Sequence, residues 1–529
     1  MLLKSCRFIV CLFMCCLLLS LCPGVAYAEE TADEQVAATD LSRNSLITDQ
    51  FGFQNTPVLF NKRTDFWYDS KESAWMTLEH EDGIGSLYFQ FTARTQPLTL
   101  VDNTSGERRE IGGYLFLHQY VDLVEVFGAA PTSVTVEFGP DSVQLAEVSA
   151  YTAGEVPDTV QKWNPPADGE ADLLLLSAHS DDEQIFFAGI APLYAVHRGY
   201  NVQVVYVCDH HNFEPYRVHE LLNGLWSVGL DTYPIIGNFP DYEFRTPQQY
   251  ISHYGKIDYA YNYYESLDIT RDDLVGFVVE QLRRFKPKVA ITHDYAGEYG
   301  HSHHMVCADV MTEAVNVSMN PDAYPEQLEQ YELWDVPKTY IHLYEENPIV
   351  LDLDTPLECF DGMSPFDLSK KIGFPCHQSQ YSAVARMITP YKTAVEMPYS
   401  PSYFGLLRST VGEDVAKNDF FENLTTHEQD AIRAEEERLA EEARLAEEAR
   451  LAEEARLAEE ARLAEEARLA EEARLAEEAR LAEEARLAEE ARFAAEAAAK
   501  QRRTIIMAAG GAAVLLIVIA VVLFIKKRR

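Results

Sequence analysis

The chain has 529 residues and a formal net charge of −41, with 85 acidic against 44 basic side chains. It is too long for one ordinary domain. Its negative field repels nucleic acid and anionic lipid, which argues against a nucleic-acid-binding protein and indicates a solvated, multidomain chain.

The first residues have the pattern of a secretory signal. Lys4 and Arg7 precede an apolar run, and Ala26-Tyr27-Ala28 matches an A-x-A cleavage site. We therefore expect residues 1–28 to be a signal peptide and the remainder of the chain to be exported.

Residues 29–164 are predicted to form a β-sandwich. Short runs of β-branched and aromatic residues, separated by polar, Gly or Pro turns, are typical of that fold. Such runs occupy residues 85–91, 114–117 and 133–138. A carbohydrate-binding role for this domain stays open.

Residues 165–432 are predicted to form a Rossmann-like α/β domain, in which helices cover a mostly parallel sheet. Thr270 and Asp273 form a capping-box-like helix start. The expected strands are residues 173–177, 202–208, 288–292 and 338–344, and the expected helices are residues 183–198, 215–228, 271–285 and 303–317.

Residues 433–503 are predicted to form a charged helical stalk. From Ala434 the hexad Leu-Ala-Glu-Glu-Ala-Arg repeats until Arg492, and these residue types are strong helix formers. Six residues advance a helix by about 600°, so the leucines wind around it. A coiled coil needs a stripe of period 3.5, so we predict a solitary helix that acts as a spacer.

Residues 504–525 are predicted to cross a membrane. The apolar run is about 21 residues long and carries no charge, which is enough for a hydrocarbon core of about 30 Å. The basic tail at residues 526–529 is then cytoplasmic under the positive-inside rule. The preceding domains would be extracellular.

Two polar clusters follow apolar runs in the α/β segment. His179-Ser-Asp-Asp-Glu183 comes directly after residues 173–177, and His301-Ser-His-His304 comes soon after residues 289–292. Open α/β sheets place their ligands at the carboxyl ends of the strands. Together the clusters supply His and Asp ligands for a three-ligand zinc site with an open position.

The motifs Ala178-His-Ser-Asp-Asp-Glu183 and Gly300-His-Ser-His-His304 resemble the family patterns A-H-P-D-D-E and G-H-P-D-H of the PIG-L/LmbE family. The resemblance extends from about Ala171 to Gln380. It implies zinc-dependent de-N-acetylation of an N-acetylglucosaminyl group. By position, the zinc ligands would be His179, Asp182 and His304, the general base Asp181, and the group facing the oxyanion His301.

Two residues depart from the family pattern. Ser180 replaces a proline, which removes no ligand. His303 replaces an aspartate that would pair with His301 and raise its pKa, so the protonation state of His301 is left open. Arg217, Asp241 and His377 are candidate sugar-binding residues.

The remaining cysteines carry two expectations. Cys208 and Cys307 are expected in the core, because the zinc ligand set is complete without them. Cys359 and Cys376 are close enough in sequence to pair in an oxidising compartment, although sequence does not fix connectivity.

Two functions therefore remain. The first is a membrane-anchored extracellular deacetylase acting on an N-acetylated sugar or glycan. The alternative is a surface glycan-binding protein or adhesin whose α/β domain is catalytically degenerate.

Overall fold

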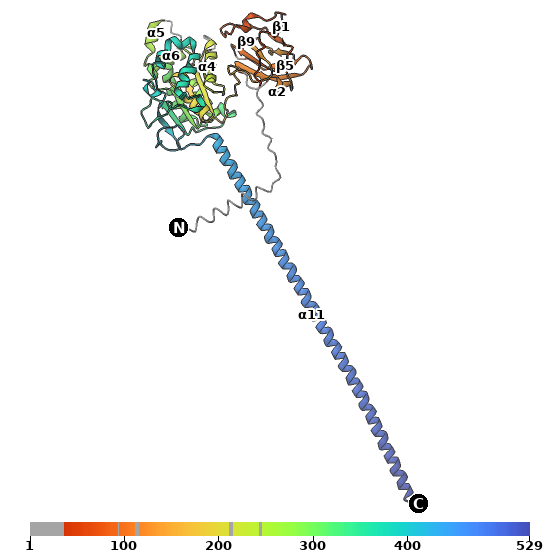
Figure 1. Ribbon diagram of the computed structural model, residues 1–529. Helices are drawn as coiled ribbons and strands as arrows, with labels where there is room; N and C mark the ends of the chain where they lie inside the picture. Colours follow the sequence, from red (N-terminus) through yellow and green to blue (C-terminus); the bar gives the residue numbers. More distant parts are fainter. Residues whose placement is uncertain (1–35, 94, 112–115, 211–214, 243–245, 529) are drawn as a thin grey trace, which may run out of the picture. The chain divides into compact units, whose positions relative to one another are not determined.

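A computed structural model describes residues 36–93, 95–111, 116–210, 215–242 and 246–528. The expected signal peptide, residues 1–28, lies outside the described residues. The chain divides into two compact units, Met1–Asp430 and Ala431–Arg529 (Figure 1).

The first part of unit one contains two antiparallel sheets, ordered β1-β3-β8-β5-β6 and β2-β9-β4-β7. Buried residues of both sheets, such as Met76, Val136, Phe89 and Val148, share one apolar core. The elements are β1 (Leu46–Asp49), η1 (Pro57–Phe60), β2 (Tyr68–Asp69), β3 (Trp75–Glu79), β4 (Ser86–Phe91), β5 (Leu98–Asp102), β6 (Arg108–Ile111), β7 (His118–Asp122), α2 (Leu123–Phe127), β8 (Ser133–Glu137) and β9 (Gln144–Tyr151).

The strand expectations for this part are confirmed at β4 and β8. Half of the expected strand at residues 114–117 lies outside the described residues. Residues 116–117 are not part of a strand, and the next strand begins at His118.

The second part of unit one is built on a seven-stranded sheet, ordered β12-β11-β10-β13-β14-β16-β15. The first five strands are parallel, and β16 joins antiparallel to both β14 and β15. The expected mostly parallel sheet is confirmed. The strands are β10 (Leu173–Ser177), β11 (Val202–Asp209), β12 (Ile235–Pro240), β13 (Val289–Thr292), β14 (Lys338–His342), β15 (Pro348–Val350) and β16 (Tyr403–Ser409).

Both faces of this sheet are buried, which explains the unbroken leucine run of β10. Leu173 and Leu175 pack in a core with residues of α4 (Pro215–Ser227). Leu174 and Leu176 pack in another core, with residues of α7 (Arg271–Phe285) and α8 (Ser302–Val317). A strand covered by helices on both faces has no polar side, so it reads as a continuous hydrophobic run.

The remaining described helices and helical turns of unit one are mostly short. They are α3 (Asp182–Ile185), η2 (Pro192–His197), α5 (Pro247–His253), α6 (Ile257–Glu265), η3 (Glu298–Gly300), η4 (Pro325–Glu329), η5 (Glu358–Phe360), α9 (Pro365–Leu368), η6 (Ser369–Gly373), η7 (Phe374–Cys376), α10 (Gln378–Val384), η8 (Ala385–Met387) and η9 (Ala394–Glu396).

The single helix expected over residues 183–198 is wrong in extent. Helix α3 ends at Ile185, and a π-helical turn follows at Pro192–His197. Gly189 interrupts the helix with φ +87°, and a Cβ there would lie 2.9 Å from the backbone nitrogen of Phe366. The close approach of α9, which is distant in sequence and which no local pattern reveals, leaves no room for a side chain at this interruption.

The expected pairing of Cys359 with Cys376 is also wrong, because both are free cysteines. Cys359 Sγ lies 3.6 Å from His197 Nδ1, and Cys376 Sγ lies 3.7 Å from Ser227 Oγ. The two cysteines are close in sequence, but η5 and η7 place them against different neighbours, so they do not pair.

A buried histidine pair links the two parts of unit one. His118 Nε2 in β7 lies 2.7 Å from His219 Nδ1 in α4, and the other nitrogen of His118 lies 2.8 Å from the hydroxyl of Tyr88. Burial, together with the neighbouring His219, holds the pKa of His118 well below its usual range. His118 is therefore neutral in the folded chain at neutral pH.

This pair predicts a loss of stability in mild acid. Below about pH 6.5 the unfolded chain takes up a proton at His118 that the folded chain refuses. The free energy of unfolding should therefore fall there by up to about 1.4 kcal/mol per pH unit from this group. Denaturant unfolding between pH 5 and 8 should show a shallower decline for His118→Gln but an unchanged one for the exposed control His197→Gln. Equal slopes in all three proteins would contradict it.

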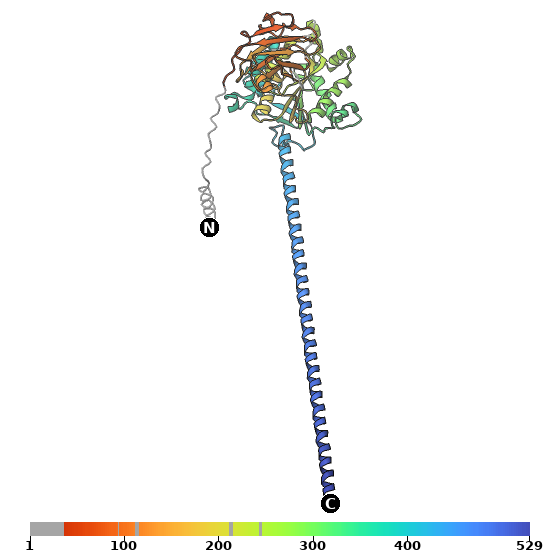
Figure 2. The same cartoon turned by 90° about the vertical axis from the view of Figure 1, so that its right-hand side faces the viewer.

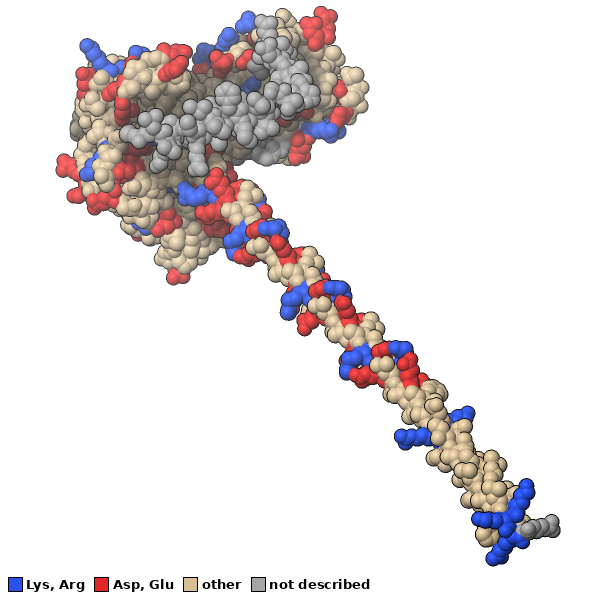
Figure 3. Space-filling model, turned by 60° about the horizontal axis from the view of Figure 1, so that its bottom comes forward, with Lys and Arg blue, Asp and Glu red and all other residues tan. Residues whose placement is uncertain are grey.

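Helix α11 runs without interruption from His427 to Lys526 (Figures 1 and 2). The hexad leucines are all 51–53% exposed, so no side of the stalk is a buried stripe. Arg438 bridges Glu435 and Glu442 at helical spacings of three and four residues, a pattern that recurs along the repeat. Figure 3 shows acidic and basic side chains alternating along this region.

The end of α11 is apolar. Among the described residues it is the one helix long and apolar enough to cross a membrane. Figure 3 shows an uncharged stretch that ends in a group of basic side chains. This finding agrees with the expected span at residues 504–525 on length and composition alone.

The stalk should be a monomeric helix that salt weakens. Each pair at these spacings contributes about 0.2–0.5 kcal/mol and is screened by salt. A peptide of residues 433–503 should sediment as a monomer and lose helical circular dichroism as salt rises. A peptide with every Glu replaced by Gln should show little salt dependence, and a dimer or a coil at low salt would sink the idea.

Candidate metal centre

The candidate site lies where the strand order of the parallel sheet reverses. From β10 the chain adds β11 and β12 on one side, then crosses to add β13 and β14 on the other. Such a switch point is where open α/β sheets bind ligands. The residues after β10 and β13, which begin at Ala178 and His293, meet at this edge: the backbone nitrogen of Ala178 donates to His293 Nε2 at 3.0 Å.

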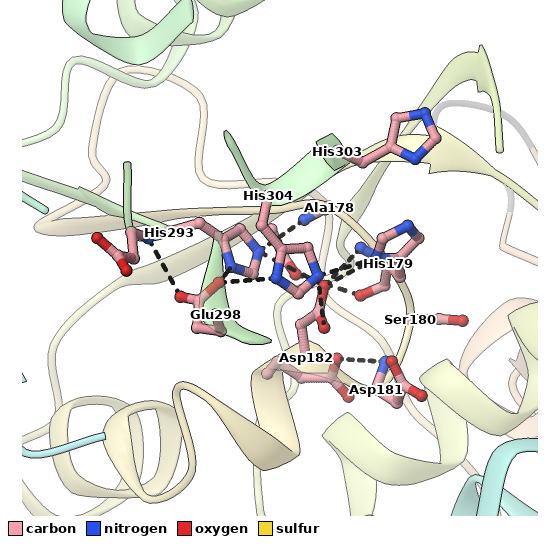
Figure 4. Close-up of polar contacts among 12 residues, drawn as sticks. Ala178, His179, Ser180, Asp181, Asp182, His293, Glu298, His303 and His304 are labelled. Atoms are coloured by element: carbon pink, nitrogen blue, oxygen red, sulfur yellow. Dashed lines mark hydrogen bonds and ion pairs between the residues drawn. The ribbon is translucent and has the colours of Figure 1, made fainter. Parts of the chain in front are cut away.

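The three expected metal ligands converge there (Figure 4). His179 Nδ1 lies 3.2 Å from Asp182 Oδ2, and His304 Nε2 lies 3.3 Å from Asp182 Oδ1. His304 Nε2 is also 3.3 Å from His179 Nδ1. All three side chains are buried. Residues far apart in the sequence thus present their donor atoms to one small space.

These separations fit a tetrahedral ion. Bonds of about 2.0–2.1 Å from zinc to nitrogen or oxygen place tetrahedral ligand atoms about 3.3–3.4 Å apart. The charges agree: although burial opposes it, Asp241 and Asp182 raise the pKa of His179 well above its usual range. The position therefore favours a positive charge, which a divalent cation would supply.

Glu298, which sequence reasoning missed, holds the histidines of the site in place. Its Oε2 accepts from Nδ1 of His293 at 2.9 Å and from Nδ1 of His304 at 2.7 Å, and its Oε1 lies 2.6 Å from Nδ1 of His342. The carboxylate has no exposed surface. Although burial opposes it, His293 and His304 hold the pKa of Glu298 well below its usual range.

The contact from Glu298 sets the chemistry of His304. Because Nδ1 of His304 carries the hydrogen donated to Glu298, its Nε2 keeps a lone pair toward Asp182 and His179. A signal for this group was present in the sequence, since His293 and His342 stand at the ends of β13 and β14. Glu298 itself lies in a turn and had no such signal.

Asp181 has the conformation and the environment of a reactive group. Its φ of +134° is rare for a residue with a side chain, and such strain persists mostly at functional sites. Burial, opposed by Arg217 and reinforced by the charge of Asp182, raises the pKa of Asp181 to about 7. A carboxyl group with a pKa near neutrality is suited to general base catalysis.

His301 and His303 lie in the same cluster but differ in their contacts. The ring of His301 lies 4.6 Å from that of His179. Burial and the charges of His179 and His304 hold the pKa of His301 well below its usual range, and among the described residues no carboxylate forms an ion pair with it. Figure 4 shows His303 turned away from the network around Glu298; its Nδ1 lies 3.3 Å from Asp241 Oδ1.

The candidate sugar-binding residues lie at different depths. Asp241 Oδ1 is 3.4 Å from His179 Nε2, and its Oδ2 is 4.0 Å from Arg217. Arg217 also donates to the carbonyl of Ser180. His377 is fully buried behind the first motif, with its Nε2 2.9 Å from Glu183 Oε1. Glu183 accepts from the backbone nitrogen of Asp181, so His377 reaches the centre through it.

The comparison with protein families agrees with this geometry. Residues 174–315 match the PIG-L family, described as GlcNAc-PI de-N-acetylase. This range contains nearly all of β10 to β13 and both sequence motifs, so the matched segment is the one that holds the candidate site.

Individual relatives match over shorter or more distant stretches. The 1D-myo-inositol 2-acetamido-2-deoxy-alpha-D-glucopyranoside deacetylase 2 of Saccharopolyspora erythraea is 39% identical over 70 residues, which are 13% of this chain and 24% of that protein. The chain thus spans about a quarter of the length of this curated relative.

Two solved structures align with the chain at low identity. The N,N'-diacetylchitobiose deacetylase of Pyrococcus horikoshii is 15% identical, with 44% of this chain and 83% of that one covered and a TM-score of 0.31. The conserved protein TT1542 of Thermus thermophilus is 16% identical, with 42% and 84% covered and a TM-score of 0.29.

Glu298→Gln should weaken metal binding by about 10–100-fold, because a neutral amide cannot accept from three imidazoles as a carboxylate does. Competition for Zn²⁺ against a chromophoric chelator measures this. Glu313→Gln, the same change at an exposed position of α8, should leave the affinity unchanged. Equal affinities for all three proteins would exclude the anchoring role of Glu298.

Proposed function

We propose that the chain is a metal-dependent N-deacetylase, with Zn²⁺ held by His179, Asp182 and His304. The observation that carries this is the 3.2–3.3 Å spacing of their donor atoms, beside an Asp181 whose pKa is about 7. When bound, zinc would supply a Lewis acid and lower the pKa of a water molecule to about 7.

The residues around the centre divide the proton transfers of amide hydrolysis. Asp181, in its ionised form, accepts a proton from the attacking water. His301, neutral because of its burial, donates an N–H hydrogen bond to the oxygen that becomes negative. When the C–N bond breaks, Asp181 returns its proton to the amine, and acetate leaves. In this mechanism His301 acts as a neutral hydrogen-bond donor, so it does not need the aspartate that the family pattern has at position 303.

The proposed substrate is an N-acetylglucosamine-type sugar or glycan. The description of the matched family and the name of the curated relative both concern an N-acetylated glucosamine group. We propose that Arg217 and Asp241, which lie next to Ser180 and His179, contact sugar hydroxyls. His377 acts at a distance, by holding Glu183 against the backbone of Asp181.

The domain boundaries are proposed as expected from the sequence: signal peptide 1–28, β-sandwich 29–164, deacetylase domain 165–432, stalk 433–503, span 504–525 and tail 526–529. The basic tail would be cytoplasmic and the catalytic domain extracellular. The stalk would keep the centre away from the membrane, near an extracellular glycan. The sandwich would hold polymer close and raise its effective concentration.

Acetate release by the purified full-length chain, from a panel of N-acetylglucosamine sugars and cell-wall glycans, tests the function. A chelator should abolish release, and added Zn²⁺ should restore it. Asp181→Asn keeps the shape of the side chain but removes the base, so it should lower the rate about 10²–10⁴-fold.

The control is Asp258→Asn, which makes the same change at an exposed position of α6 and should retain full activity. Release that resists the chelator, or that survives in Asp181→Asn, would overturn the mechanism. No release from a folded, zinc-loaded protein would leave the glycan-binding alternative as the better account.

A further inference from the structure

A second group of metal-ligating atoms lies on the other side of the His179 ring. One donor atom each from His179, Cys208, Asp241 and His303 lies within 4.8 Å of all the others. The zinc ligands proposed above share only His179 with this group. The proposed deacetylase needs one metal ion, so its function does not explain the second set.

Four separate elements bring these side chains together. Cys208 lies near the end of β11, and His303 lies in the first turn of α8. Asp241 follows β12, where the pairing with β11 contains a register shift. At the shift a Cβ on Gly237 would lie 2.5 Å from the carbonyl oxygen of Val207. Bulges of this kind often re-aim side chains near active sites. This one lies a few residues before Asp241, at the end of β12.

Three of the four ring nitrogens of this group make no hydrogen bond within the described residues. His303 is 2% exposed, yet among the described residues neither of its ring nitrogens makes a hydrogen bond. His179 Nε2 is likewise buried without one. Buried polar atoms without a partner are uncommon and call for an explanation such as an ion. The arrangement is not that of a satisfied core.

The spacing fits a metal ion. Asp241 Oδ1 lies 3.4 Å from His179 Nε2 and 3.3 Å from His303 Nδ1, the separation that a tetrahedral zinc site requires of its ligands. The set of one thiol, two imidazoles and one carboxylate suits zinc or another borderline divalent ion rather than Ca²⁺ or Mg²⁺. The second oxygen of Asp241 remains free to face Arg217.

We propose that a second divalent metal ion binds here, held by Cys208 Sγ, Asp241 Oδ1, His303 Nδ1 and His179 Nε2. The His179 ring then bridges both ions, one at each nitrogen. To bind both, the ring gives up both of its N–H protons to solvent, and Cys208 binds as the thiolate after releasing its own proton. His303, the departure from the family pattern, is a ligand of this second site.

Cobalt substitution of the full-length chain tests the proposal. Loaded with excess Co²⁺ and desalted, the protein should retain two ions per chain. It should also show the near-ultraviolet absorption of a thiolate bound to cobalt, which the first site cannot produce because it has no sulfur ligand. Cys208→Ser should lose this band and one of the two ions.

The matched control is Cys307→Ser, at a buried cysteine of α8 that belongs to neither ligand group; it should keep the band and both ions. X-ray absorption of the zinc-loaded unmutated protein should show a sulfur neighbour at about 2.3 Å, so the outcome does not depend on the folding of a variant. One ion per chain without sulfur scattering, or a band lost in Cys307→Ser but kept in Cys208→Ser, would overturn the proposal.

The two proposals fail in different ways. Acetate release by a protein with a single, sulfur-free metal site would leave the deacetylase function intact and exclude the second site. A sulfur-ligated second ion in a chain that releases no acetate would support the second metal site and count against the deacetylase function.

Discussion

The buried carboxylate of Glu298 is the interaction on which the rest of the site depends. A charge without exposed surface is costly unless it is fully hydrogen-bonded. Three imidazoles meet this need, and they come from the ends of β13 and β14 and from the start of α8. The packing of these elements and the orientation of His304 are therefore conditional on one another.

This constraint also explains why the centre attracts a cation. Asp182 and Glu298 are buried and Asp241 is half-buried beside them, so three carboxylates gather around a small group of histidines. A divalent ion is the compact charge that satisfies several such ligands together. His179 stands between two groups of ligands, so one ring couples the proposed catalytic ion to the proposed second ion.

In the sequence, histidine at position 303 removes the aspartate that the family pattern places beside His301. In the structure, the same histidine supplies an additional candidate metal ligand. The aspartate that it replaces would have paired with His301. In the fold, His303 faces Asp241 instead, and His301 is left neutral among other rings. No carboxylate among the described residues therefore takes the place of the missing aspartate beside His301. The nearby carboxylate of Asp241 faces His303 and belongs to the second group of candidate ligands.

The sequence by itself determined four strands of the seven-stranded sheet, the helices α4, α7 and α8, the two clusters of His and Asp, and the helical stalk, because each depends on local periodicity and spacing. Only the tertiary structure decided that Gly189 ends α3 early, that Cys359 and Cys376 stay apart, and that Glu298 joins three histidines. These outcomes rest on contacts between residues distant along the chain. Such contacts arise from how sheet and helices pack, which local patterns do not encode.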